Sequence, residues 1–173
     1  MNDLPNAPNK PVRPKQHAPH LGERRLFHAN FDITATPSAA APARLFIKTT
    51  LRDWGAGGVI DDALSVGTEL VSNAIRAVEK QAATNALGQW QPNGVSKLIR
   101  LRLLGLSQTV AVEVWDRVPD APLILPFSME RENGRGLYLI DSLSLRWGYY
   151  WMRPSGKVVW SELAVTNHQA VNA

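Results

Sequence analysis

Two neighbouring runs of alternating residues limit the fold of this chain more than any other feature. In residues 97–104 and 109–116 an apolar side chain stands at every second position, which is the period of a half-buried strand. The two runs follow each other closely along the chain, so we expect them to form a hairpin. A second hairpin is predicted for residues 146–152 and 157–165, around a Pro-Ser-Gly turn at 154–156.

One more strand and three helices are predicted from the remaining patterns. Residues 27–33 alternate like the hairpin strands. The first helix follows Thr36-Pro37, an N-cap residue and a proline at the first helical position. In chain order the predicted helices cover about residues 41–54, 59–80 and 134–145. Residues 83–95 and 117–133 are expected to be loops.

This order of elements predicts the fold class and the domain organisation. The strands outnumber the helices between them and come in adjacent hairpins, which favours α+β: a two-layer sandwich of a mixed, mostly antiparallel sheet with helices on one face. Residues 23–166 are expected to form one domain. Residues 1–22 contain five prolines and few large apolar side chains, so we expect a disordered, basic tail. Residues 167–173 are predicted to be a C-terminal tail.

Composition excludes several classes of protein. The chain has no cysteine, which excludes disulfides and thiolate metal sites. It has no apolar run near the ~20 residues of a membrane span and no signal peptide, so we expect a soluble, cytoplasmic protein without membrane association. Residues 1–25 hold +3 of the net charge of +4. Because the body is nearly neutral, no nucleic-acid partner is expected.

Three groups of residues are candidates for chemistry, and each also has a purely structural interpretation. Glu69 and Asn73 share one face of the second predicted helix, either as solvated residues or as a base and a hard oxygen ligand for Mg²⁺. Asp116 ends an apolar strand face, either as a turn residue or as an inward carboxylate that accepts a hydrogen bond from an amino group such as that of adenine.

The third group is the sequence Gly134-Arg135-Gly136 at the start of a predicted helix. It is either a simple loop-to-helix junction or a phosphate cradle. In a cradle, the glycines let backbone N–H groups approach the anion and Arg135 adds a charged contact.

Four segments together resemble one family in order and spacing. They are "TELVSNAIRAVEK" (68–80), "VEVWDRVPDAP" (112–122), "ENGRGLYLIDSLSLRWG" (132–148) and "GKVVWSEL" (156–163). The family is the GHKL, or Bergerat-fold, histidine kinase-like ATPases, and the closer likeness is to the small single-domain branch that includes anti-sigma-factor serine/threonine kinases. The resemblance spans roughly residues 24–165.

The resemblance implies a role for each matching position. Glu69 would correspond to the general base, and Asn73 to the residue that binds Mg²⁺ held by ATP. Asp116 would match the adenine-binding aspartate. Gly134 and Gly136 would match the glycines that hold the phosphates, and residues 118–133 would match the ATP lid.

Two functions are therefore expected from the sequence. The first is an ATP-binding regulatory protein that phosphorylates a serine or threonine on a partner of the anti-anti-sigma or sigma factor type. The second is a non-enzymatic interaction module that sequesters a transcription regulator. The second is favoured by the absence of glycine from residues 117–122, and by the apolar stretch 122–126, which is either core or a docking surface. The sequence leaves open whether kinase activity is present and whether the protein forms a homodimer.

Overall fold

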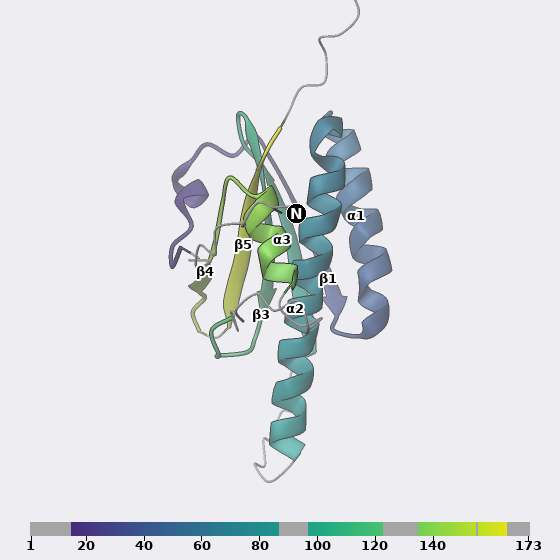
Figure 1. Ribbon diagram of the computed structural model, residues 1–173, viewed down its shortest axis with the longest axis vertical. Coiled ribbons are helices and arrows are strands. Elements are labelled where there is room, and N and C mark those ends of the chain that lie inside the picture. The colour runs from purple at the N-terminus through teal and green to yellow at the C-terminus, as the bar shows by residue number, and fades with distance from the viewer. Residues whose placement is uncertain (1–14, 87–96, 123–134, 155, 166–173) are drawn as a thin grey trace, which may run out of the picture.

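A computed structural model describes residues 15–86, 97–122, 135–154 and 156–165. Its centre is a five-stranded sheet of strand order β1-β2-β3-β5-β4, and all four strand pairings are antiparallel (Figure 1). The strands are β1 (Phe27–Thr34), β2 (Leu98–Gly105), β3 (Thr109–Asp116), β4 (Arg146–Trp151) and β5 (Lys157–Ala164). Each lies within two residues of its predicted bounds.

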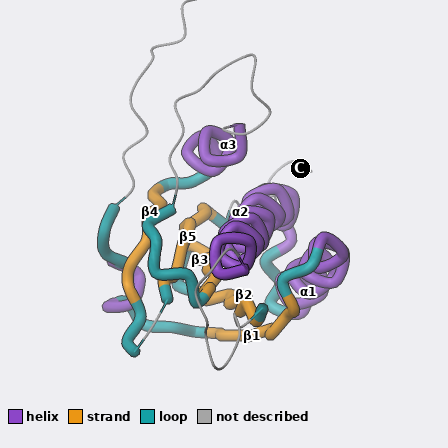
Figure 2. The backbone as a smooth tube through the Cα atoms, turned by 90° about the horizontal axis from the view of Figure 1, so that it is seen from below, coloured by secondary structure: helices purple, strands orange, loops and turns teal. Residues whose placement is uncertain are grey.

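The helices all lie on one face of this sheet, as the end-on view in Figure 2 shows. They are α1 (Ala40–Asp53), α2 (Ile60–Ala86) and α3 (Arg135–Leu143). Short 3₁₀ turns, η2 (Pro37–Ala39) and η3 (Gly57–Val59), lead into α1 and α2. The predicted α+β class, with helices on one face of the sheet, is confirmed, whereas the sheet that was expected to be mixed and mostly antiparallel has only antiparallel strand pairings among the described residues.

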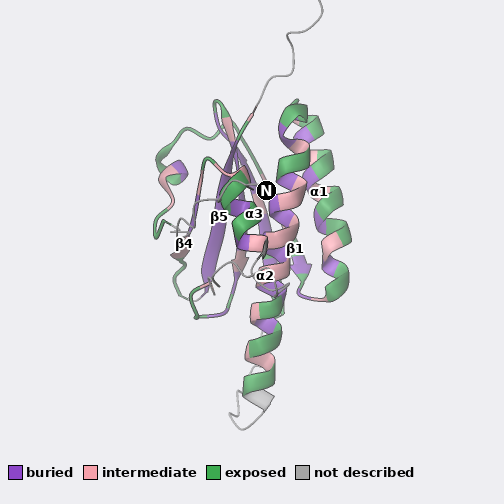
Figure 3. Cartoon of the chain, viewed as in Figure 1, coloured by how far each residue is buried: buried purple, intermediate pink, exposed green. Residues whose placement is uncertain are grey.

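The core lies between the sheet and α1 and α2. The inward positions of β2 and β3 are buried, while both helices turn their apolar stripes onto them (Figure 3). The largest fully buried aliphatic side chains of the core include Ile47, Leu51, Leu70, Ile99, Leu101 and Leu103. Burying a side chain of this size contributes about 1.5–3 kcal/mol each, so the alternation in the strands is what fixes the sheet on the helices.

Helix α2 is longer than predicted. It continues to Ala86, whereas the sequence pattern placed a loop from residue 83. The apolar stripe fades after residue 80, but residues 80–86 are mostly good helix formers and include neither glycine nor proline. Intrinsic helix propensity therefore extends the helix past the point where burial stops supporting it.

The predicted N-terminal tail is partly ordered, which corrects the expectation for residues 15–22. Lys15 pairs with the edge of β4: its N–H donates to Trp147 O at 3.0 Å, and Tyr149 N–H donates to Lys15 O at 2.8 Å. Gly148 permits this approach, because a Cβ there would lie 2.7 Å from the Lys15 carbonyl carbon. Residues 1–14 and 166–173 lie outside the described part of the chain.

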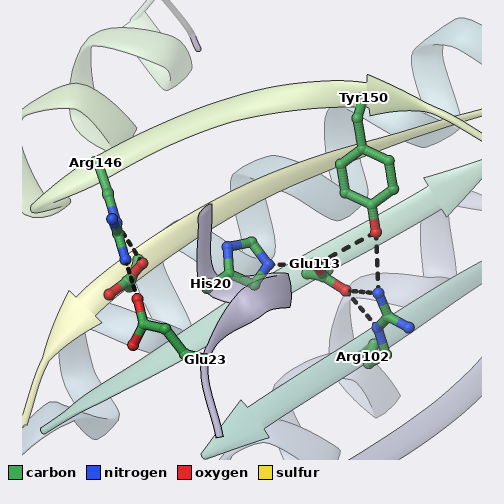
Figure 4. A network of polar contacts seen from close by, with 7 residues as sticks. His20, Glu23, Arg102, Glu113, Arg146 and Tyr150 are labelled. Carbon is green, nitrogen blue, oxygen red and sulfur yellow. Dashed lines mark hydrogen bonds and ion pairs between the residues drawn. The ribbon is translucent and has the colours of Figure 1, made fainter. Parts of the chain in front are cut away.

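A 3₁₀ turn, η1 (Pro19–Gly22), then lies on the side of the sheet away from the helices (Figure 1), and it carries His20. His20 is fully buried, and its Nε2 lies 2.6 Å from Glu113 Oε1 (Figure 4). Arg102 pairs with the other carboxylate oxygen of Glu113 and donates to Tyr150 Oη at 3.0 Å. Buried charges require such partners, so the segment is held by a polar network that composition alone did not predict.

Candidate functional site

A cavity of about 470 Å³ lies between α2, the adjoining ends of β3 and β5, and the first turn of α3. Three residues predicted as binding residues line it: Asn73 from α2, Asp116 from β3 and Gly136 from α3. These positions come from three distant parts of the chain. The structure thus brings together one member of each predicted group.

Glu69 lies beside this cavity, one helical turn before Asn73. It is not among the lining residues, but its carboxylate meets Gly136: a Cβ at that glycine would lie 2.8 Å from Glu69 Cδ and closer still to its Oε2. A larger residue at position 136 would push the Glu69 carboxylate away. The glycine therefore leaves room for the Glu69 carboxylate beside the first turn of α3.

The glycine group has two other members, Gly134 and Arg135. Gly134 lies outside the described residues. Arg135 is the first residue of α3, and its side chain is likewise outside what the structure describes. The predicted contacts of Gly134 and Arg135 with phosphate stay predictions, although the N-terminal turn of α3, the positive end of its dipole, borders the cavity through Gly136.

Asn73 already has a partner within the protein. Arg76, one turn further along α2, donates from Nη2 to Asn73 Oδ1 and lies 3.9 Å from Glu69 Oε2. The side chain of Arg76 is 55% exposed. A pair this exposed is worth about 0–1 kcal/mol, so an incoming ligand can displace the guanidinium at small cost.

Asp116 points inward, as predicted, and is 1% exposed. Its Oδ1 accepts hydrogen bonds from Lys157 Nζ at 2.8 Å and from Val118 N–H at 2.9 Å. Burial raises the pKa of the Asp116 carboxyl above its ordinary value, and the charge of Lys157 opposes that rise. The floor of the cavity is thus an ion pair with no net charge.

Lys157 is the residue that sequence reasoning missed. It opens the last strand two positions before Val159 and so shares its face, which was a usable signal. However, its meeting with Asp116 depends on the pairing of β3 with β5, in which the two residues stand directly opposite each other. The predicted hairpins do not contain that pairing, because β3 and β5 are separated by α3 and β4.

The remaining lining gives the cavity one apolar and one cationic part. Apolar side chains from α2 and the sheet form walls on either side; they are Leu70, Ala74, Ala77, Val114, Val118 and Val159. Arg76 and Lys80 add positive charge along α2. A flat ring with a polar edge would fit the walls and floor, and an anionic group would fit near Arg76 and the start of α3.

No cluster of three or more His, Asp or Glu side chains that could hold a metal ion occurs in the described ranges. Asn73 and Glu69 are hard oxygen donors one turn apart, which suits Mg²⁺ only if a bound phosphate supplies further oxygens. No helix among the described residues is long and apolar enough to cross a membrane.

A second hollow of about 400 Å³ lies on the opposite face of the sheet and is lined by Asn30 and several arginines. Arg100 pairs there with Asp32 at 2.5 Å, and Arg102 pairs with Glu113. The Arg102–Glu113 pair belongs to the buried network that holds the N-terminal segment, and the exposed Arg100–Asp32 pair links β2 to β1, so both arginines have structural partners.

Comparison with known proteins does not identify a family: the chain matches neither a protein-family model nor a curated protein sequence. The function of the cavity therefore has to be inferred from its own geometry, in which Asn73, Asp116 and Gly136 face one enclosed space.

Proposed function

We propose that this protein is an ATP-binding regulatory protein with the Bergerat fold, similar to anti-sigma-factor serine/threonine kinases, and that it acts on a partner regulatory protein in the cytoplasm. The observation that carries the proposal is the convergence of Asn73, Asp116 and Gly136 on one cavity. These are the positions that the family resemblance selected, and they are far apart in the sequence. The α+β fold, with its helices on one face of an antiparallel sheet, further supports it.

Each lining residue has a task in this proposal. Asp116 accepts a hydrogen bond from the adenine amino group, while the apolar walls hold the ring. The first turn of α3 and Arg76 face the phosphates, which a helix N-terminus and a guanidinium both attract. Mg²⁺, when bound with ATP, would neutralise phosphate charge beside Asn73.

Glu69 serves as the base in the proposed reaction. Its carboxylate is partly exposed beside Gly136, at the phosphate end of the cavity, where a serine or threonine hydroxyl of a partner can approach. It accepts the proton of that hydroxyl as the hydroxyl oxygen bonds to the γ-phosphorus of ATP, while the bond from that phosphorus to the β,γ-bridging oxygen breaks and ADP leaves. Positioning by the cavity supplies the rest of the catalysis.

Calorimetric titration with ATP and Mg²⁺ tests the nucleotide site. We expect the wild-type protein to bind ATP saturably. The affinity should fall tenfold or more in Asn73→Ala and in Asp116→Asn, because each substitution removes a charged or metal-linked contact that contributes about 1.5–3 kcal/mol to binding. Asn30→Ala, on the opposite face of the sheet, is the matched control and should bind as wild type does. Absence of saturable binding by the wild-type protein would refute the proposal.

Transfer of labelled γ-phosphate to a candidate partner tests the kinase step separately. Glu69→Gln keeps the shape of the side chain but cannot accept the proton at neutral pH, so we expect it to bind ATP and to lose transfer. Transfer at the wild-type rate in Glu69→Gln would remove Glu69 from the reaction.

A second candidate function is a non-enzymatic interaction module that sequesters a transcription regulator. The observation that favours it is that Asn73 Oδ1 and Asp116 Oδ1 both have partners inside the protein, Arg76 and Lys157. Under this hypothesis the partner binds with equal affinity with and without ATP, and no phosphate is transferred. A partner affinity that changes at least tenfold with ATP would exclude it.

A further inference from the structure

The buried ion pair on the cavity floor presents a defined pattern of hydrogen-bonding groups to a ligand. An ammonium has three N–H donors. Lys157 Nζ uses one on Asp116 Oδ1 at 2.8 Å and one on Val118 O at 3.4 Å. Among the residues that the structure describes, nothing accepts the third.

The Asp116 carboxylate also has an unused hydrogen-bonding position. Both hydrogen bonds to Asp116, from Lys157 Nζ and from Val118 N–H, fall on Oδ1. Within the described chain, Oδ2 accepts none. The floor therefore offers one donor and, next to it, one acceptor, and it carries no net charge.

A ligand cannot displace Lys157 in the way that it can displace Arg76. The Lys157 side chain is 4% exposed and its partner Asp116 is 1% exposed, so removing the lysine would leave a buried carboxylate without its counter-ion. A ligand must instead accommodate Lys157. Any ligand edge that lacks an acceptor at that point would leave a buried N–H unsatisfied.

We infer that Lys157 reads the base: its ammonium donates to the ring nitrogen N1 of a 6-aminopurine while Asp116 Oδ2 accepts from the neighbouring amino group. This inference rests on the proposed ATP-binding function and names the residue that sets its base specificity. The adenine edge carries one acceptor beside one donor, which complements the floor. The apolar walls from Leu70, Val114 and Val159 hold the two faces of the ring.

Nucleotide analogues test this on the unaltered protein. Calorimetric titration in Mg²⁺ compares ATP with 1-deaza-ATP, in which N1 is a C–H, and with 7-deaza-ATP, which is altered on the other side of the base. We expect 1-deaza-ATP to bind at least tenfold more weakly than ATP, because a buried charged donor is left unpaired. We expect 7-deaza-ATP to bind within threefold of ATP.

Lys157→Met tests the same contact from the protein side, after circular dichroism has shown that the variant folds. In the folded variant we expect ATP and 1-deaza-ATP to bind with equal affinity. If Lys157→Met alone does not fold, the neutral pair Asp116→Asn/Lys157→Met takes its place, with the same expectation. Tenfold discrimination that persists in either folded variant would overturn the inference.

The outcomes separate this inference from the proposed function. Binding of ATP together with equally tight binding of 1-deaza-ATP by the wild-type protein overturns only the role of Lys157. Failure of the wild-type protein to bind any of the three nucleotides overturns the nucleotide site, and this inference with it.

Discussion

The ion pair between Asp116 and Lys157 allows a quantitative stability prediction. Lys157→Met removes the ammonium but nearly keeps the length and volume of the side chain, so packing changes little. Asp116 then has no counter-ion, while its hydrogen bond from Val118 N–H remains. Breaking a buried pair by removing one partner costs about 3–5 kcal/mol.

The cost in this variant has a ceiling that depends on pH, because Asp116 can take up a proton. Burial already raises the pKa of Asp116, and loss of Lys157 raises it further. When the pKa of a carboxyl is higher in the folded state than in the unfolded state, the free energy of unfolding of the protein falls as the pH rises from the unfolded-state pKa toward the folded-state pKa. Protonating an aspartate of ordinary pKa ~3.9 costs about 1.4 kcal/mol per pH unit, which is about 4 kcal/mol at pH 7 and about 1.5 kcal/mol at pH 5.

Urea unfolding followed by tryptophan fluorescence measures both values. We expect the free energy of unfolding of Lys157→Met to be lower than that of wild type by about 3–4 kcal/mol at pH 7 and by about 1.5 kcal/mol at pH 5. The double variant Asp116→Asn/Lys157→Met keeps an acceptor for Val118 N–H and has no buried charge, so it should lie within about 2 kcal/mol of wild type at both pH values. A loss below about 1 kcal/mol at both pH values would show that the pair is hydrated, and the reasoning would be wrong.

Three further predictions concern the opposite face and the edge of the sheet. Gly148→Ala places a methyl group against the Lys15 backbone, so we expect the free energy of unfolding to fall by about 1–3 kcal/mol and trypsin to cleave faster after Lys15. The control is Gly57→Ala, because a Cβ at Gly57 would meet no other atom within 4 Å. His20→Ala empties a fully buried position and should cost about 2–4 kcal/mol in urea unfolding, against less than about 0.5 kcal/mol for the exposed His28→Ala. Burial raises the pKa of Tyr150 to about 12. Because the folded state keeps that proton longer, the free energy of unfolding of wild type should fall by about 1–2 kcal/mol more than that of Tyr150→Phe between pH 10 and pH 12, and parallel pH profiles of unfolding would contradict this.

The elements of this fold were predictable because each depends on local pattern. Period-two alternation marked β2 and β3, and the Thr36-Pro37 start marked the approach to α1 within a few residues. Pro42 falls in the first turn of α1, where its missing N–H has no partner to lose. The end of α2 was missed because helix propensity, rather than burial, carries its last turns.

The partners of the buried charges were not predictable in the same way. Asp116 was expected to point inward, and a buried carboxylate requires a partner. Which residue supplies it depends on the register between β3 and β5, which are not neighbours in sequence. The same holds for His20, which looked like part of a tail: its place under Glu113 requires a segment 93 positions earlier to fold back across the sheet.

The two internal partners of the candidate binding groups differ in a way that bears on the choice between the proposed functions. Arg76 is 55% exposed, so its contact with Asn73 is nearly free to break and does not prevent Asn73 from meeting a metal-bound phosphate. Lys157 is almost fully buried, and removing it from Asp116 costs several kcal/mol, a large share of any nucleotide's binding energy. A ligand of this cavity must therefore either use Lys157 as a donor or leave the floor untouched. If Lys157 donates to the base, the ion pair is compatible with an ATP site. If no ligand contacts the ion pair, the cavity has no base-recognition group, and the non-enzymatic interaction module is the remaining candidate function.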